Sequence, residues 1–196
     1  MIKIISGIIL AAGSSKRMGK QKLLLPFKDS TILEEVVKTV INCSALGEII
    51  VVYQSEEVLN TIKKYDVKTI YNPIAEKGQS TSLVAGMKSC NTKTKAYMFI
   101  MGDQPFINID TMDAIIETWN KNPNSIIVPR YNGKNGMPTI FSSNFKQELM
   151  NVTGDKGGRD IIKANPDTIM YVDFCDTMAG FDIDTLEDYY KCLKKI

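Results

Sequence analysis

The chain has 196 residues, of which 44% are hydrophobic and 23% are charged, a composition typical of one globular domain. Its 24 Lys and Arg residues nearly balance its 22 Asp and Glu residues, which argues against the basic surface of a nucleic-acid-binding protein. Because the chain contains no histidine, Ser-His-Asp and Cys-His catalytic schemes are excluded. Its 4 cysteines form no C-x-x-C pair, which disfavours a zinc site and a disulfide framework.

The N-terminal apolar segment raises the question of targeting. Residues 4–12 loosely resemble a short signal peptide, but few basic residues precede them, and a strand followed by a turn is the favoured interpretation. No apolar run approaches the roughly 20 residues of a membrane span. We therefore expect a cytoplasmic protein without membrane or nucleic-acid partners, whose chemistry uses carboxylates, amines, hydroxyls, backbone amides or an oxygen-bound metal.

Apolar runs of strand length alternate with segments of helical periodicity along the first two thirds of the chain. We expect strands at residues 4–10, 48–54, 68–71, 96–101 and 125–129, and helices at residues 31–43, 56–64, 81–90 and 110–120. Asp110 is the expected N-cap of the last of these helices. This alternation predicts a parallel sheet with helices on both faces.

The last third of the chain has a more mixed pattern. Strands are expected at residues 139–141 and 168–173, and helices at residues 143–150, up to about residue 164, and from Thr185 onward. The whole chain is interpreted as a single α/β domain, a three-layer α/β/α sandwich with a Rossmann-like, mostly parallel sheet. Ligands of such folds bind beyond the carboxyl ends of the strands, so the loops after the first five strands are the places to find a site.

The loop after the first strand, residues 10–22, reads LAAGSSKRMGKQK. Its small residues allow close approach of the backbone to a ligand, and Arg17 and Lys22 add charge suited to phosphate. The loop lacks the spacing of both well-known phosphate-binding fingerprints. A flexible surface turn is the alternative interpretation. The predicted nucleotide-binding residues of this loop are Leu10, Ala11, Ala12, Gly13, Ser14, Ser15, Arg17 and Lys22.

Two acidic segments are candidate metal sites. Asp103 directly follows an apolar strand, where a carboxylate suits Mg²⁺, although capping of a turn or helix is an equal alternative. Asp182 and Asp184 alternate with apolar residues and so share one face of an extended segment. Either Asp184 or Thr185 can cap the last helix, which leaves one carboxylate as a second metal ligand.

Two glycine-containing segments precede predicted helices. Residues 78–83 place hydroxyls and amides at a helix mouth, where Gly78, Ser80 and Ser82 are candidates for binding a nucleobase or ribose. An ordinary N-cap by Ser80 or Thr81 is the alternative. Residues 154–159 offer an anion site for an acceptor phosphate, or alternatively a loop and a capped helix.

The segment of residues 10–22 resembles the LAAGxSxRMGxxK signature of the NTP-transferase-like nucleotidyltransferases. Within them it is most similar to the molybdenum cofactor cytidylyltransferases. Five further segments resemble that subgroup in the same order along the chain: residues 23–26, 78–83, 101–105, 154–159 and 182–185. The resemblance thus covers nearly the whole chain and is far more specific than any one motif.

The resemblance implies a nucleotide-diphospho-sugar transferase-like fold. The N-terminal half would bind CTP, or another NTP, with Mg²⁺ as cofactor, and the C-terminal half would bind a pterin-phosphate acceptor, molybdopterin. Asp103 and Asp184 correspond to the family's metal-binding carboxylates and Lys22 to its phosphate-contacting lysine. Ala12 favours cytidine, since guanylyl-transferring relatives tend to have glycine there. The expected acceptor-binding residues are Gly136, Pro138, Gly157 and Arg159.

The predicted reaction is in-line transfer of CMP from CTP to the acceptor phosphate with release of pyrophosphate. Arg17, Lys22 and Asp103 are the predicted catalytic residues, acting by positioning and electrostatics. One departure from the subgroup concerns the acceptor, because many relatives read G-H-P where this chain has Met137 between Gly136 and Pro138.

Three alternatives to this reaction remain from the sequence. One is a nucleotidyltransferase acting on a sugar or polyol phosphate. Another is a non-catalytic accessory protein that hands a molybdenum cofactor to a client molybdenum hydroxylase. The third, an NAD-binding oxidoreductase, is disfavoured by the missing glycine fingerprint.

Overall fold

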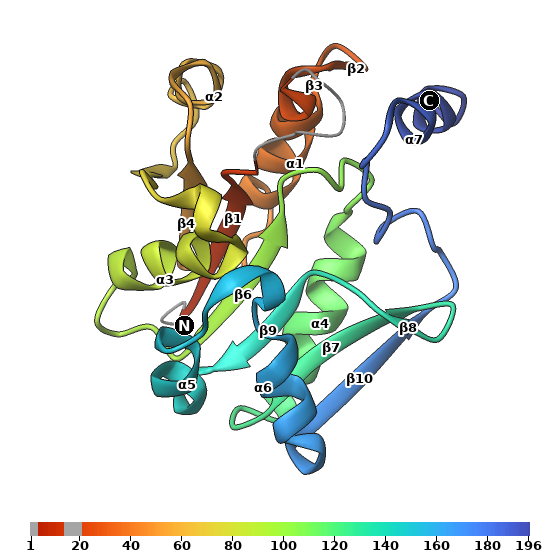
Figure 1. Cartoon of the computed structure of the whole chain (residues 1–196). Coiled ribbons are helices and arrows are strands. Elements are labelled where there is room, and N and C mark those ends of the chain that lie inside the picture. Colours follow the sequence, from red (N-terminus) through yellow and green to blue (C-terminus); the bar gives the residue numbers. More distant parts are fainter. Residues whose placement is uncertain (1–3, 14–20) are drawn as a thin grey trace.

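The computed structural model describes residues 4–13 and 21–196 and is built around one large mixed sheet (Figure 1). The strands are β1 (Ile5–Ala11), β4 (Glu48–Tyr53), β5 (Lys68–Tyr71), β6 (Ala96–Met101), β7 (Ile126–Tyr131), β8 (Lys134–Asn135), β9 (Thr139–Ser142) and β10 (Ile169–Phe174). Their order is β10-β7-β9-β6-β1-β4-β5, with β8 paired to β7. β9 runs antiparallel to both β6 and β7, while β1, β4, β5 and β6 are mutually parallel. The predicted mostly parallel α/β fold is confirmed.

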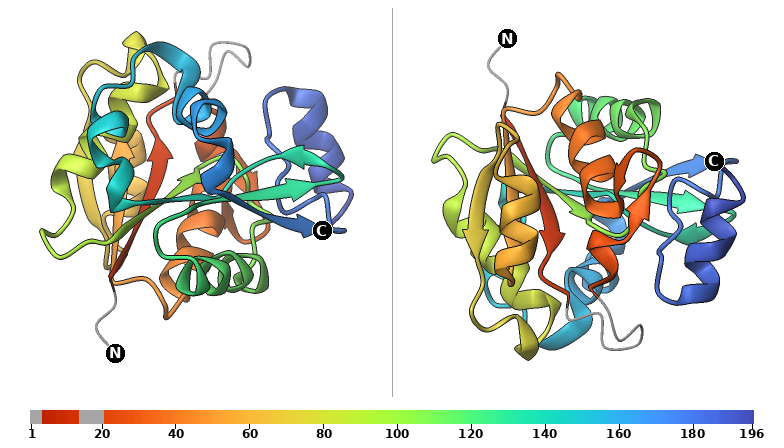
Figure 2. Two further views of the ribbon diagram at one scale, coloured as in Figure 1. Left: turned by 90° about the horizontal axis from the view of Figure 1, so that it is seen from below. Right: turned by 90° about the horizontal axis from the view of Figure 1, so that it is seen from above.

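Helices cover both faces of the sheet (Figure 2). They are α1 (Ile32–Ile41), α2 (Glu56–Ile62), α3 (Gln79–Ser89), α4 (Ile109–Lys121), α5 (Lys146–Met150), α6 (Arg159–Ala164) and α7 (Leu186–Leu193). Alternate residues of β1 face opposite sides, so that Ile9 packs in the core with α1, α2 and α4, and Ile8 packs in the core with α3, α5 and α6. The predicted three layers follow from this alternation.

Helix α7 and a short hairpin form a third, smaller apolar cluster. The hairpin consists of β2 (Pro26–Phe27) and β3 (Ser30–Thr31), which were not expected from the sequence. Phe27 and Ile32 pack here against Ile183, Tyr189 and Cys192. This cluster joins the segment after the first loop to the end of the chain.

Three predictions about helix starts are decided by the structure. Asp110 is not the N-cap of α4; Asn108 is, because its side chain accepts a hydrogen bond from the Thr111 amide at 2.8 Å. An N-cap by Ser80 or Thr81 is also wrong, since α3 begins at Gln79. Thr185 caps α7, which leaves Asp184 outside the cap.

No helix in the described part of the chain combines the length and apolar character needed to cross a membrane. All the cysteines are free thiols.

Candidate active site

The site begins where β1 and β6 end side by side. The Gly102 amide, just beyond β6, donates a hydrogen bond to the Leu10 carbonyl at 3.1 Å. A Cβ atom on Gly102 would lie 3.0 Å from that carbonyl oxygen and 3.2 Å from Leu33 Cδ1. Glycine therefore lets the two strand ends approach closely, and the next residue, Asp103, comes to the carboxyl edge of the sheet.

An ammonium group lies between two carboxylates at this edge. Lys22 Nζ is 2.5 Å from Asp103 Oδ2 and 3.0 Å from Asp184 Oδ1. The Lys22 and Asp103 side chains are only 12% and 8% exposed. Asp103 Oδ1 is buried and has no hydrogen-bond partner among the described residues. The structure thus brings together three residues that lie 81 and 162 positions apart in sequence.

Burial and neighbouring charges shift the pKa values of two side chains at this edge, Lys22 and Asp182. Burial lowers the pKa of Lys22, but the charges and hydrogen bonds of Asp103 and Asp184 outweigh it and raise the pKa above its ordinary value. Asp182 behaves in the opposite sense: desolvation of its carboxyl group, then the charge of Asp103, raises its pKa to about 6. Gln104 Nε2 donates to Asp182 Oδ1 at 2.9 Å. Lys22 therefore keeps its charge to a higher pH than an ordinary lysine, while Asp182 loses its proton at a higher pH than an ordinary aspartate.

Backbone contacts fix the segment that carries Asp184. The Ile183 amide donates to the Asp103 carbonyl at 3.1 Å, and the Ile183 side chain is fully buried in the third apolar cluster. Tyr189 Oη donates to the Pro26 carbonyl at 2.7 Å, tying α7 to the hairpin after Lys22. The third cluster thus positions both partners of the Lys22–Asp184 ion pair.

The start of α3 is built against the loop of residues 154–158. Gly78 has a φ of +116°, and a Cβ atom there would lie 2.5 Å from the Gly154 backbone. Asp155 Oδ1 accepts a hydrogen bond from the Gln79 amide at 3.2 Å, which supplies the helix with a carboxylate at its N-terminus. Gln79 Nε2 also lies 3.2 Å from Met101 Sδ, linking this helix to the end of β6.

The two serines near the start of α3 are buried. Ser80 and Ser82 are 2% and 5% exposed. The Ser82 hydroxyl accepts a hydrogen bond from Asn72 Nδ2 at 2.9 Å. Their role in binding a nucleotide stays a prediction.

The residues predicted to bind the acceptor reach the same edge of the sheet. Because Phe99 pairs with Thr139 in the antiparallel β6–β9 ladder, the segment of residues 136–138 lies at the carboxyl end of β6. A Cβ atom on Gly136 would lie 2.6 Å from the Tyr131 ring, whose hydroxyl donates to the Met137 carbonyl at 2.9 Å. The Met137–Pro138 peptide is cis. This packing fixes the turn that carries Gly136 and Pro138.

The second segment predicted to bind the acceptor contains one buried and one exposed residue. Gly157 is buried with a φ of +54°, and a Cβ atom there would lie 3.1 Å from Gln79 Oε1. Arg159 is exposed. Acceptor binding by these residues stays a prediction.

Within the first loop, Leu10, Ala11 and Ala12 are buried at the end of β1, and Gly13 is exposed. Ser14, Ser15 and Arg17 lie outside the described residues. Sequence reasoning overlooked four further residues that shape the site: Asn72, Gln79, Gln104 and Asp155. Each belongs to, or lies near, a motif that was noted. Gln79, Gln104 and Asp155 each have a partner 76 or 78 positions away, whereas the partners of the Asn72 side-chain amide lie 9 and 10 positions away.

The carboxylates present at the site fit a divalent metal of the kind that the sequence predicts. Mg²⁺ in proteins is usually held by one or two carboxylates together with substrate phosphates. Asp103 and Asp184 supply two such groups, and Asp103 Oδ1 has lone pairs that no described hydrogen bond uses. The described residues contain no cluster of three or more potential metal ligands, so the protein offers two carboxylates rather than a complete cage.

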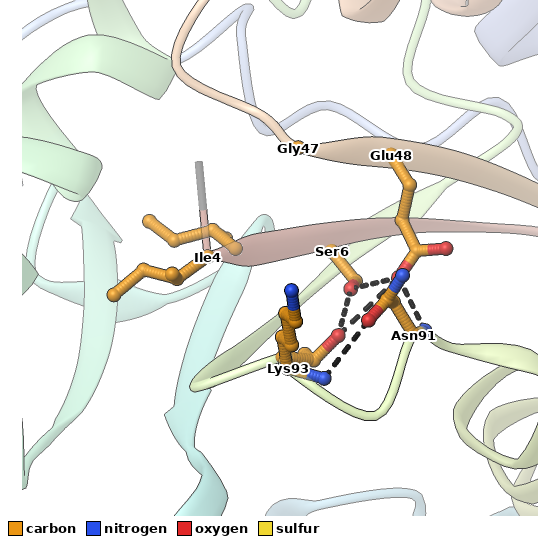
Figure 3. Close-up of a pocket in the computed structure, with 8 residues that line it drawn as sticks. Ile4, Ser6, Gly47, Glu48, Asn91 and Lys93 are labelled. Carbon is orange, nitrogen blue, oxygen red and sulfur yellow. Dashed lines mark hydrogen bonds between the residues drawn. The ribbon is translucent and has the colours of Figure 1, made fainter. Parts of the chain in front are cut away.

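A hollow of about 160 Å³ lies at the opposite edge of the sheet, at the amino ends of β1 and β4 (Figure 3). There Glu48 Oε1 accepts hydrogen bonds from Ser6 Oγ at 2.6 Å, the Asn91 amide at 2.7 Å and Thr94 Oγ1 at 3.3 Å. Because its polar atoms bond to one another, this hollow is a structural feature and not a second candidate site.

Comparison with known proteins decides the family. The sequence model of the MobA-like NTP transferase domain matches residues 7–169. The chain belongs to this family. The match contains the end of β1, Lys22 and Asp103, while Asp184 lies beyond its end. The predicted resemblance to NTP-transferase-like nucleotidyltransferases is confirmed.

Several relatives match over much of their length. Nicotine blue oxidoreductase of Paenarthrobacter nicotinovorans is 24% identical and the match covers 96% of each chain. Purine catabolism protein PucB of Bacillus subtilis is 29% identical over 93% of each. The molybdenum cofactor cytidylyltransferase of Escherichia coli is 30% identical over 69% of this chain and 68% of its own. A probable molybdenum cofactor guanylyltransferase of Bacillus mycoides is 24% identical over 97% and 96%.

Solved structures agree on the fold. A mycobacterial homologue of Rv0371c, from strain JC1, superposes with a TM-score of 0.88 at 25% identity, covering 100% of this chain and 98% of that one. Rv0371c of Mycobacterium tuberculosis in complex with manganese gives a TM-score of 0.82 at 24% identity, covering 98% and 99%. At 24% identity, the likeness to the manganese complex shows only a shared fold.

Proposed function

We propose that the protein is a Mg²⁺-dependent nucleotidyltransferase that moves CMP from CTP to the terminal phosphate of molybdopterin. The observation that carries this proposal is the juxtaposition of Lys22, Asp103 and Asp184 at the carboxyl ends of β1 and β6. The family supports nucleotidyl transfer, and the Escherichia coli relative supports cytidine and a molybdenum cofactor.

The reaction needs no general base. An oxygen of the acceptor phosphate forms a bond to the α-phosphorus of CTP, while the bond to the bridging oxygen breaks and pyrophosphate leaves. A phosphate is already ionised at neutral pH, so no proton has to be removed from the nucleophile. This chemistry suits a chain that has no histidine.

The residues act by binding and orientation. Arg17, Lys22 and the amides of residues 12–15 hold the β- and γ-phosphates, which become the leaving group. Asp103 and Asp184 would hold the metal, which would supply positive charge to offset that of the phosphate oxygens. Gly78, Ser80 and Ser82 form the nucleoside side of the site.

The single domain is proposed to divide its work between two halves. The N-terminal half binds the nucleotide, and the C-terminal half binds the acceptor through Gly136, Pro138, Gly157 and Arg159. Support comes from the position of the segment of residues 136–138, which lies at the carboxyl end of β6 beside the charged cluster.

Thermal unfolding with each of CTP, GTP, ATP and UTP in the presence of Mg²⁺ tests the nucleotide side. We expect CTP to raise the melting temperature more than the other nucleotides do. In a second assay, addition of molybdopterin should give CTP-dependent release of pyrophosphate. Ala12→Gly is expected to shift this preference toward GTP. Equal protection by all four nucleotides, or none by any, would contradict the proposal.

A second candidate is an accessory protein that binds a molybdenum cofactor and delivers it to a client molybdenum hydroxylase. It is favoured by the two relatives that match over 96% and 93% of their length, since their names refer to nicotine blue and to purine catabolism. This candidate predicts binding of the pterin without pyrophosphate release. The same product analysis therefore separates the two functions.

A further inference from the structure

The position between Asp103 and Asp184 is already filled by a positive group of the protein itself. Lys22 Nζ contacts Asp103 Oδ2 at 2.5 Å and Asp184 Oδ1 at 3.0 Å. With a side chain only 12% exposed, Lys22 is not a surface lysine that reaches a carboxylate by chance. The protein thus neutralises part of the negative charge that two neighbouring carboxylates would otherwise hold.

We propose that Lys22 is an internal substitute for the divalent metal, holding the metal ligands until a triphosphate draws its ammonium away. Metal and nucleotide then bind together rather than independently. The inference rests on the proposed function, because it takes Asp103 and Asp184 as the metal ligands.

The charges and contacts of the site imply that the Lys22 ammonium and a metal ion compete for one position. The ammonium donates to one oxygen of each carboxylate, and these are atoms that a bound metal would use. A divalent cation and an ammonium repel one another in a partly buried setting, where the effective dielectric constant is well below that of water. Both cannot occupy this position, so the metal binds only when the ammonium leaves.

The Lys22 ammonium takes the place of the metal only in part, which favours its exchange for a metal ion. Asp103 is 6% exposed, yet its Oδ1 atom has no hydrogen-bond partner among the described residues. An unused acceptor this deeply buried lowers stability unless a ligand fills it. A metal ion could engage that oxygen in addition to Oδ2, whereas the Lys22 ammonium engages Oδ2 alone.

Only the side chain of Lys22 needs to move. Its backbone is fixed by hydrogen bonds from the Leu25 amide to the Lys22 carbonyl and from the Leu24 amide to the Gln21 carbonyl, both 3.1 Å long. The next residue, Leu23, is 2% exposed and anchors the turn in the core. A lysine on a fixed backbone can swing its four-carbon stem toward the phosphates, which offer the ammonium a new anionic partner.

Metal binding without nucleotide provides the test. Mn²⁺ titrations of the full chain, followed by the electron paramagnetic resonance signal of the free ion, give the affinity directly. We expect Lys22→Met to bind Mn²⁺ roughly tenfold more tightly than the wild type, a coupling of ordinary size between two ligands of one site. In the wild type, CTP should raise the Mn²⁺ affinity.

A matched control is available on the neighbouring hairpin. Lys28 also pairs with a carboxylate, Glu35 at 3.4 Å, but its side chain is 48% exposed. Lys28→Met removes the same charge and should leave Mn²⁺ binding at the wild-type value. Adding Asp103→Asn to Lys22→Met should abolish the gain, which shows that the extra affinity belongs to this site. If Lys22→Met does not fold, Lys22→Gln replaces it.

The outcomes separate the two proposals. Equal or weaker Mn²⁺ binding by folded Lys22→Met overturns the inference, even if CTP and metal still bind the wild type together. Tighter binding by Lys22→Met with no nucleotide bound by any variant supports Lys22 as the occupant of the metal position, but it contradicts both its release by a triphosphate and the proposed function.

Discussion

Each of the two edges of the sheet carries a carboxylate at or just beyond the end of a strand, and the two carboxylates differ in their hydrogen-bond partners. At the amino edge, Glu48 Oε1 accepts three hydrogen bonds, from Ser6, Asn91 and Thr94. At the carboxyl edge, Asp103 has one described side-chain partner, Lys22, and a buried oxygen with none. The neighbouring Gln104 also has a buried oxygen without a hydrogen-bond partner in the part of the chain that the structure describes.

The contrast separates structural from functional polarity. A carboxylate oxygen that accepts from three fixed donors holds strands and loops together but has little capacity left for a ligand. A buried carboxylate oxygen with unused lone pairs lowers stability and keeps that capacity. The carboxyl edge of this protein therefore has the chemical character of a binding site, and the amino edge has that of a structural joint.

The largest expected effect is on activity at the carboxyl edge. Asp103→Asn removes a metal ligand while keeping the shape of the side chain, so pyrophosphate release should fall by about 100- to 1000-fold. The free energy of unfolding should fall by about 2 kcal/mol, because a largely buried ammonium loses one carboxylate partner while Lys22 keeps Asp184. Activity assays and urea denaturation measure the two effects. Wild-type activity in this variant would contradict the role of Asp103.

The next effect concerns the contact between Gly78 and the loop of residues 154–158. Gly78→Ala places a Cβ atom 2.5 Å from the Gly154 backbone at a φ of +116°, so the free energy of unfolding should fall by about 3 kcal/mol. Gly154→Ala is the control, since its φ is +68° but no atom lies within 4 Å. Urea denaturation should show the smaller loss, about 1 kcal/mol, for the control. Equal losses would mean that the close approach is not rigid.

A moderate effect on stability alone is expected at the amino edge. Glu48→Ala leaves the buried Ser6 hydroxyl and the Asn91 amide without this acceptor, and the free energy of unfolding should fall by about 2 kcal/mol. Glu48→Gln keeps an oxygen acceptor and should lose less. Nucleotide protection in thermal unfolding should be retained in both variants. A loss of nucleotide binding would show that the two edges are coupled.

The smallest effect is a dependence of stability on pH. The pKa of Asp182 is raised to about 6, above the unfolded value of about 4, so the folded state holds this proton more tightly. The corresponding stability is present below about pH 4 and lost as pH rises through 6. Asp182→Asn should therefore raise the melting temperature at pH 8 relative to the wild type, and not at pH 4.

Asp188 provides a control of opposite sign on the same segment. Hydrogen bonds from Thr185, first of all from its side chain, lower the pKa of Asp188. Its stabilising effect is present above the unfolded pKa and is lost as pH falls. Asp188→Asn should thus lower the melting temperature at pH 8 and have less effect in acid. The same sign for both variants would contradict the proposed electrostatics of the carboxyl edge.

The sequence by itself determined most of the strands and helices, though not the β2–β3 hairpin, and it predicted the edge of the sheet where the candidate site lies. Periodicity located β6 at the residues that the structure gives it, because buried strands of a parallel sheet are nearly continuous apolar runs. The bounds of β5 also agree, although this edge strand is only partly buried. The prediction that Asp110 caps α4 failed because Asn108 and Asp110 both suit a cap, and only the backbone geometry distinguishes them. The family was also readable from motifs in their order along the chain.

Tertiary structure alone decided which side chains meet. The ion pairs of Lys22 join residues far apart in sequence, and the contact of Asp155 with the start of α3 spans 76 positions. Local periodicity carries no signal for such pairs, since they depend on strand order and on how loops fold back over the sheet edge. The same holds for the unpartnered oxygen of Asp103, because burial and missing donors are properties of the packed chain.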